Sequence, residues 1–174
     1  MNLGRVLVTM GDGNAARQAF LAAERVAPQN PDPQFSLARL YVMAGRYRDA
    51  IERFERAAAY DPTMTIAVLS VADTLRQSDR PAAALPIYAE LLVADEDFAA
   101  ARFGAAIAMV QLNRWDDALQ ALFEGMNRHP DDAGFAHATA RLLAAAPDDA
   151  VRNGLFALEI ISVLIDTQPI TVVS

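Results

Sequence analysis

Apolar side chains recur at helical spacing from Pro31 to Ala44, which predicts an amphipathic helix over this range. A second apolar stripe, formed by Ala50, Phe54 and Ala57, predicts another helix from about Tyr47 to Tyr60. The alanines of this stripe are small, so the two helices can pack closely. Residues 31–64 are therefore predicted to form one helix–turn–helix unit.

The ends of these two helices carry residues that stop a helix. Gly45 takes the left-handed backbone conformation at little cost, so it is suited to end the first helix. Pro62 ends the second helix, because a proline pushes the residue before it, here Asp61, out of the helical region.

The same pattern recurs every 34 residues, and such a period indicates a repeat architecture. Four columns of residues keep step with it. They are Pro28, Pro62 and Pro130, with Glu96 at the missing node; Gly11, Gly45, Asp79 and Asn113; Ala16, Ala50, Ala84 and Ala118; and Phe20, Phe54, Tyr88 and Leu122. The columns divide the chain into units 1–30, 31–64, 65–98, 99–132 and 133–166, followed by a tail at 167–174.

The first and last units depart from the pattern. The opening helix of the first unit lacks its initial turn, so this unit is truncated. The fifth has Pro147, Asp148 and Asp149 where a glycine turn is expected. We expect Asp148 or Asp149 to cap a last helix that runs to about Ile165.

These residues resemble the tetratricopeptide repeat, whose motif has Leu-Gly in its first helix, Gly then Tyr at the turn, and then Ala, Phe, Ala and Pro. The matching residues in this chain are Leu3, Gly4, Gly45, Tyr47, Ala50, Phe54, Ala57 and Pro62. The departures are Asp79 and Pro81 in the third unit, and Trp115 and Gly125 in the fourth. The resemblance covers residues 1–132, and the stretch 142–159 is similar to a terminal unit of some bacterial members.

The resemblance implies an all-α fold in which about five pairs of antiparallel helices stack into one right-handed superhelical solenoid over residues 1–166. It also implies that the first helices line a concave groove that binds a partner. The groove residues implied in this sequence are Arg5, Phe35, Arg39, Val42, Met43, Leu69, Asp73, Arg76, Gln77, Phe103, Ile107, Gln111, His137 and Arg141.

This groove combines apolar residues with four arginines and one aspartate. A surface of this kind suits an extended or helical peptide that carries bulky apolar anchors and acidic groups. The alternative for the apolar members is that they pack between neighbouring first helices. The arginines, Arg39 and Arg76 above all, are harder to explain by packing.

The composition narrows the function further. The net charge is −7, so neither nucleic acid nor an anionic membrane attracts the chain in general. Lysine and cysteine are absent, which excludes Schiff-base chemistry, thiolate metal sites and cysteine nucleophiles. No apolar run is long enough to span a bilayer. We expect a soluble protein, with the cytoplasm favoured but the compartment unassigned.

Catalytic residues are not evident in the sequence. His129 and His137 stand alone without metal-ligand spacing, and the paired aspartates at 131–132 and 148–149 are typical of caps and turns. We expect no enzyme activity, no metal and no cofactor. The favoured function is a scaffold or adaptor that binds a partner protein. The alternative is the repeat region of a longer protein, such as an enzyme whose catalytic domain lies outside this chain.

The last predicted helix is unusually apolar, since only Glu159 and Ser162 are polar between Leu155 and Ile165. We expect one face to pack on the preceding helix through Leu155, Phe156 and Ile160. The residues left without cover are Leu158, Ile161 and Ile165. A further repeat, the tail at 170–173 or a second copy would cover them, and for the chain alone we expect a homodimer.

Overall fold

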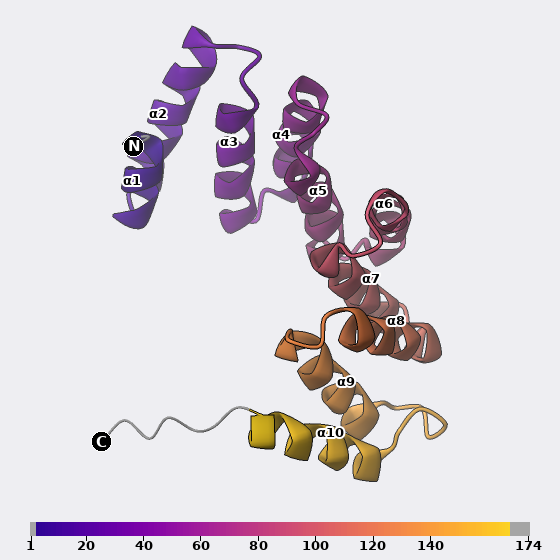
Figure 1. Ribbon diagram of the computed structural model, residues 1–174. Helices are drawn as coiled ribbons and strands as arrows, with labels where there is room; N and C mark the ends of the chain where they lie inside the picture. The colour runs from indigo at the N-terminus through magenta and orange to yellow at the C-terminus, as the bar shows by residue number, and fades with distance from the viewer. Residues whose placement is uncertain (1–2, 168–174) are drawn as a thin grey trace, which may run out of the picture. The chain divides into compact units, whose positions relative to one another are not determined.

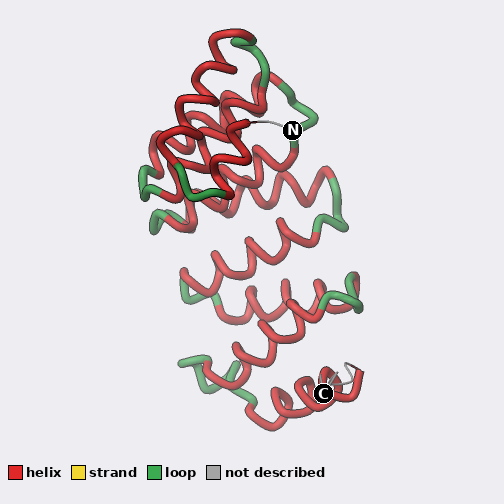
Figure 2. The backbone as a smooth tube through the Cα atoms, turned by 90° about the vertical axis from the view of Figure 1, so that its left-hand side faces the viewer, coloured by secondary structure: helices red, strands yellow, loops and turns green. Residues whose placement is uncertain are grey.

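The computed structural model describes residues 3–167, and within them the chain forms ten α-helices and no strand (Figures 1 and 2). The helices are α1 (Leu3–Thr9), α2 (Gly13–Val26), α3 (Pro31–Met43), α4 (Tyr47–Tyr60), α5 (Thr65–Gln77), α6 (Pro81–Ala94), α7 (Ala99–Gln111), α8 (Trp115–Arg128), α9 (Ala133–Ala145) and α10 (Gly154–Thr167). The predicted all-α architecture of helix pairs is confirmed.

The chain divides into two compact units, residues 1–87 and 88–174, and the boundary falls inside α6. In the first unit α1 packs on α2, α2 on α3, α3 on α4, and α4 on α5. In the second unit α7 packs on α8, α8 on α9, and α9 on α10. One continuous solenoid over residues 1–166 stays a prediction.

The 34-residue turn column has one backbone conformation throughout. Gly11, Gly45, Asp79 and Asn113 have φ angles of 79°, 69°, 57° and 58°, all in the left-handed region. Glycine adopts this region freely, and Asp and Asn tolerate it better than other residues do. The residue in this column therefore ends the first helix in each of the four 34-residue repeats that carry it, whether or not the residue is glycine.

In the first unit, a core cluster joins the first three helices. Ala16 and Phe20 of α2 are buried with Leu37 of α3, and partly buried side chains of α1 pack against them. Gly4 of α1 makes room for the ring, since a Cβ atom there would lie 2.3 Å from Cε1 of Phe20.

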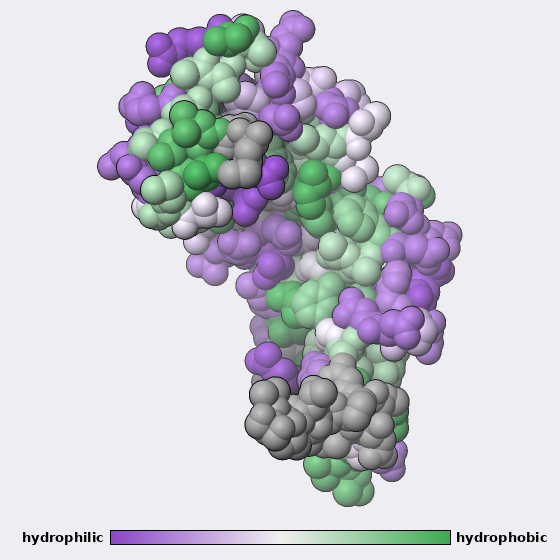
Figure 3. Space-filling view, turned by 60° about the vertical axis from the view of Figure 1, so that its left-hand side comes forward, coloured by the Kyte–Doolittle hydropathy of each residue, from purple (hydrophilic) through white to green (hydrophobic). Residues whose placement is uncertain are grey.

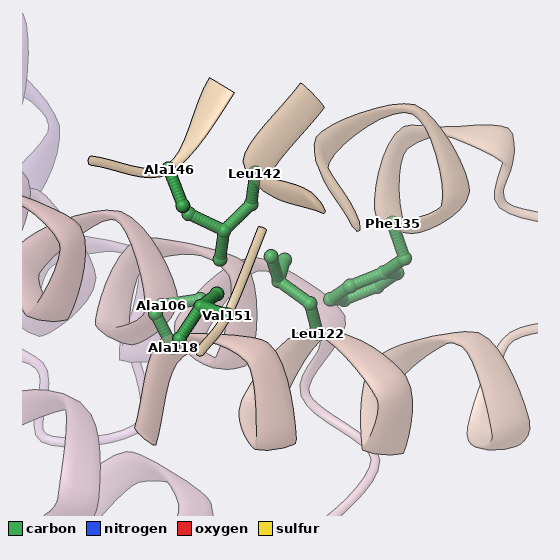
Figure 4. Close-up of a cluster of buried hydrophobic side chains, with 7 residues drawn as sticks. All are labelled: Ala106, Ala118, Leu122, Phe135, Leu142, Ala146 and Val151. Atoms are coloured by element: carbon green, nitrogen blue, oxygen red, sulfur yellow. The ribbon is translucent and has the colours of Figure 1, made fainter. Parts of the chain in front are cut away.

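The second unit has a corresponding cluster, which the close-up in Figure 4 shows. Leu122 of α8 lies between Phe135 of α9 and the side chains of Leu142 and Val151. Gly125 leaves space for Phe135, because a Cβ atom at residue 125 would lie 2.2 Å from its ring. Val151 reaches this core from the loop between α9 and α10 and is only 3% exposed.

That loop corrects the predicted cap of the last helix. Neither Asp148 nor Asp149 caps α10, which begins at Gly154. The side chain of Asn153 does so instead, by accepting a hydrogen bond from the Phe156 amide at 3.1 Å. Asp148 closes a turn by accepting from the Ala150 amide at 2.9 Å. Because Val151 is buried in the core, the chain forms a turn at residues 148–152 and the last helix begins only after Asn153.

The buried face of α10 also differs from the prediction. Ile160 is buried as predicted, together with Ala157, and Ile161 packs against them with partial burial. Leu155, expected to be covered, is 78% exposed, and Phe156 is 38% exposed. The helix is therefore rotated relative to the expected face. Leu158 is exposed as predicted, whereas Ile161 is covered in part, and the side chain of Ile165 lies outside the described residues.

A polar junction ties α2, α3 and α4 together in the first unit. Gln34 is 1% exposed, and its amide nitrogen donates to Oε1 of Glu24 at 2.8 Å. Nη1 of Arg53 donates to the same Glu24 oxygen at 2.8 Å and to the Gln34 amide oxygen at 2.7 Å. Each partly buried polar group in the junction thereby has a partner, as burial requires.

The junction lowers the pKa of Glu24. Burial of the carboxyl group raises the pKa, but hydrogen bonds from Gln34 and Arg53 and the charges of Arg53 and Arg56 outweigh it. Glu24 therefore stabilises the fold fully above its ordinary pKa of 4.5, and this contribution is lost as the pH falls through the lower folded-state value.

We predict that Glu24→Gln lowers the free energy of unfolding by a constant amount from pH 7 down to about pH 4.5, and by less at lower pH. Urea unfolding of both chains over a pH series measures this difference. A difference in the free energy of unfolding that stays the same down to pH 3 would contradict the assigned role of the ionised carboxylate.

Candidate functional site

The first helices of the first unit expose two arginines at equivalent positions. Arg5 of α1 and Arg39 of α3 are 34 residues apart, and both are exposed. Neither forms an ion pair or hydrogen bond with any residue that the structure describes. Their guanidinium groups are therefore available to an external carboxylate, which they can bind through two parallel hydrogen bonds.

The next first helix carries an ion pair in place of a lone cation. Asp73 of α5 stands at the position equivalent to Arg39, and its Oδ1 lies 3.6 Å from Nη2 of Arg76. Arg76 is thus partly neutralised within its own helix. The exposed cation Arg5 of α1 therefore recurs as Arg39 in α3, which also carries Asp32 in its first turn, and an ion pair replaces it on α5.

The apolar residues predicted for this surface divide by burial. Met43 is 75% exposed, whereas Val42 is partly buried. Phe35 is also partly buried and packs edge-to-face on Phe54, with ring centroids 5.2 Å apart. Leu69 is 5% exposed, so in this structure it belongs to the core and does not face a ligand. Gln77, at the end of α5, is exposed.

The predicted residues of the second unit lie on α7 and α9. Phe103 and Ile107 are partly buried, and the ring of Phe103 packs edge-to-face on Phe135 at 5.5 Å. Gln111, His137 and Arg141 are exposed. Nδ1 of His137 lies 2.7 Å from the carbonyl oxygen of Ala133 one turn earlier, so this ring is held along its own helix.

The histidines take part in local packing and hydrogen bonding. His129 follows the last residue of α8, and its ring stacks on Phe135 with centroids 5.8 Å apart. In the described part of the chain, no group of three or more His, Cys, Asp or Glu side chains is placed to hold a metal ion. No described helix combines the length and apolar character needed to cross a bilayer.

The polar junctions were not anticipated from the sequence, although the repeat contains their signal. Gln34 and Arg102 are each the fourth residue of a first helix. Arg102 is 7% exposed; its Nη1 lies 2.9 Å from Oε2 of Glu124, and its Nη2 donates to the Glu96 carbonyl at 2.8 Å. Comparing the fourth residues of the first helices, in addition to the motif residues, would have shown that Gln34 and Arg102 are long polar side chains at a position that is otherwise short.

Helix pairs repeating every 34 residues around a small-residue core define a helical repeat protein. A family model described as tetratricopeptide repeat matches residues 2–72 and 75–142. The chain belongs to the tetratricopeptide repeat family. No sequence among the curated proteins matches it significantly.

Several solved structures share the fold. MamA from Desulfovibrio magneticus RS-1 has a TM-score of 0.78 at 14% identity, over 95% of this chain and 90% of that one. YrrB, a tetratricopeptide repeat protein described as having an unusual peptide-binding site, has a TM-score of 0.68 at 20% identity, over 98% and 85%. TTC0263, a tetratricopeptide repeat protein from Thermus thermophilus, has a TM-score of 0.69 at 19% identity, over 97% of this chain and 90% of that one.

Proposed function

We propose that this protein is a scaffold or adaptor that acts by binding, and that a segment of a partner protein docks on the surface of its first helices. The observation that carries the proposal is the pair of exposed, unpaired guanidinium groups of Arg5 and Arg39. Family membership supports it, as does the peptide-binding site named for the fold neighbour YrrB.

The charge pattern favours a partner with acidic groups. The chain is acidic overall, with 22 Asp and Glu against 15 Arg, so exposed arginines without partners stand out. Arg76 contributes less than Arg5 and Arg39, because Asp73 lies beside it. Met43 offers an exposed apolar contact at the end of α3. A peptide with carboxylates and bulky apolar anchors complements both features.

We predict that Arg39→Glu weakens binding of a short peptide of alternating leucine and glutamate by about tenfold or more, since it replaces attraction by repulsion. Fluorescence anisotropy with the labelled peptide gives the affinity. The matched control is Arg48→Glu on α4, whose side chain is 95% exposed and which should bind normally. Equal weakening by both variants, or none, would show that the first helices are not the binding surface.

We also propose that a second copy packs on α10. Leu155 and Leu158 are 78% and 66% exposed and lie three residues apart, on one side of the helix. Hydrophobic residues reach the surface at the bottom of the space-filling view, at the height of α10 (Figure 3). Covering such side chains on association favours a homodimer.

We predict that the chain sediments as a dimer at high concentration and that Leu158→Glu makes it monomeric, because the change buries a charge in the interface. Sedimentation equilibrium measures the mass. Val93→Glu on α6, where the side chain is 87% exposed, serves as control and should stay dimeric. A monomeric parent chain at every concentration would rule out this interface.

A further inference from the structure

A pocket of about 610 Å³ lies in the second unit, between the end of α8, the start of α9, and α10. None of the residues predicted for the groove lines it. Its apolar lining comprises Met126, Pro130, Ala133, Ala136, Phe156, Ile160, Val163 and Leu164. Phe156 and Val163 are 38% and 61% exposed, so the apolar wall is open to a ligand.

The pocket lies at repeat positions equivalent to those that form the polar junction of Glu24, Gln34 and Arg53 in the first unit. Ala136 and Gln34 are each the fourth residue of a first helix. Ile160 and Arg53 are each the seventh residue of a second helix. Met126 corresponds in the same way to Glu24, each being the twelfth residue of its helix. The three apolar residues of the pocket therefore replace the three members of the junction.

Side-chain length at the fourth position explains why the space is open. Gln34 fills the junction of α3 and is 1% exposed, and Arg102 fills that of α7 and is 7% exposed. Both are long side chains with a hydrogen-bonding end. Ala136 has only a methyl group at this place, and no other described side chain fills the volume.

Carboxylates give the pocket a sign of charge. Asp131, Asp132 and Glu159 line it and are exposed, the partly buried His129 also lines it, and no arginine does. One oxygen of Asp132 accepts from the Gly134 amide at 2.9 Å. Neither Asp131 nor Glu159 forms an ion pair within the described residues. An apolar wall with these carboxylates is complementary to an apolar group carried next to a cation.

We propose that this pocket binds a second partner segment, in which a bulky apolar side chain stands beside arginine or lysine. The apolar side chain fills the space that Ala136 leaves, and the neighbouring cation pairs with Asp131 or Glu159. The ligand is opposite in charge to the acidic segment proposed for the first helices, so the two surfaces select different partners.

The test uses the full chain and a short labelled peptide of alternating leucine and arginine, with a leucine–glutamate peptide for comparison. Fluorescence anisotropy should show the arginine peptide binding. Ala136→Met, which fills the pocket from within, should weaken that binding by about tenfold or more. Val163→Arg places a cation on an exposed part of the wall, so it should repel the arginine peptide and weaken binding without the risk of disturbing the core.

Val93→Arg on α6 is the matched control, because it makes the same change at an exposed valine that does not line the pocket. It should keep full affinity for the arginine peptide, and the leucine–glutamate peptide separates this test from that of the first-helix surface. The methyl resonance of Met126, assigned through Met126→Leu, should shift on addition of the arginine peptide and not of the glutamate peptide.

Three outcomes would overturn the proposal. The first is equal binding of both peptides, or binding of the arginine peptide that neither Ala136→Met nor Val163→Arg weakens. The second is binding that appears only after residues 168–174 are removed, which would make the end of the chain the occupant. The third is self-association of the chain that Ala136→Met abolishes, which would make a second copy the occupant.

Discussion

One packing arrangement recurs along the chain: second helices bury a large side chain and first helices bury a small residue, as where Gly4 makes room for Phe20. The large residues are Phe20, Phe54, Tyr88 and Leu122, each at most 2% exposed. The small residues are Gly4, Ala38, Ala72, Ala106 and Ala140, also spaced by 34 and buried. Close approach of helix axes requires small side chains on one partner, and protein interiors tolerate little change in volume.

The proposed binding surface follows from this packing. Because the buried columns fix which face of each first helix points inward, Arg5, Arg39 and Arg141 are left exposed, and Asp73 and Ile107 at the equivalent positions are partly exposed. This packing weakens in the fifth repeat, residues 133–166, where Ile161 takes the place of the large buried residue and is only partly covered. The same repeat has Ala136 at the position equivalent to Gln34 of the polar junction, and the pocket opens there. The pocket thus opens where the repeat departs from its own pattern.

The sequence predicted the helices well, because the repeat supplies each signal several times. The turn column was found from Gly11 and Gly45 and holds the same φ at Asp79 and Asn113. The α9–α10 loop has no such support, so burial of Val151 and capping by Asn153 were missed. The exposure of the predicted groove residues was harder to predict. Met43 and Leu69 are both apolar residues of first helices, but Met43 is exposed and Leu69 is buried. Only packing with other helices decides between these cases.

The central packing claim is tested most directly at Gly104, a further buried small residue, which lies in the interior of α7 against the large side chain of Tyr88. A Cβ atom there would lie 2.5 Å from the buried ring of Tyr88. The measurement is the free energy of unfolding of Gly104→Ala. If small-against-large packing governs the fold, the change destabilises by about 1–3 kcal/mol, although alanine favours helix by about 1 kcal/mol. Gly154→Ala, with nothing within 4 Å, should be neutral or stabilising. A Gly104→Ala chain as stable as the Gly154→Ala chain would contradict the account.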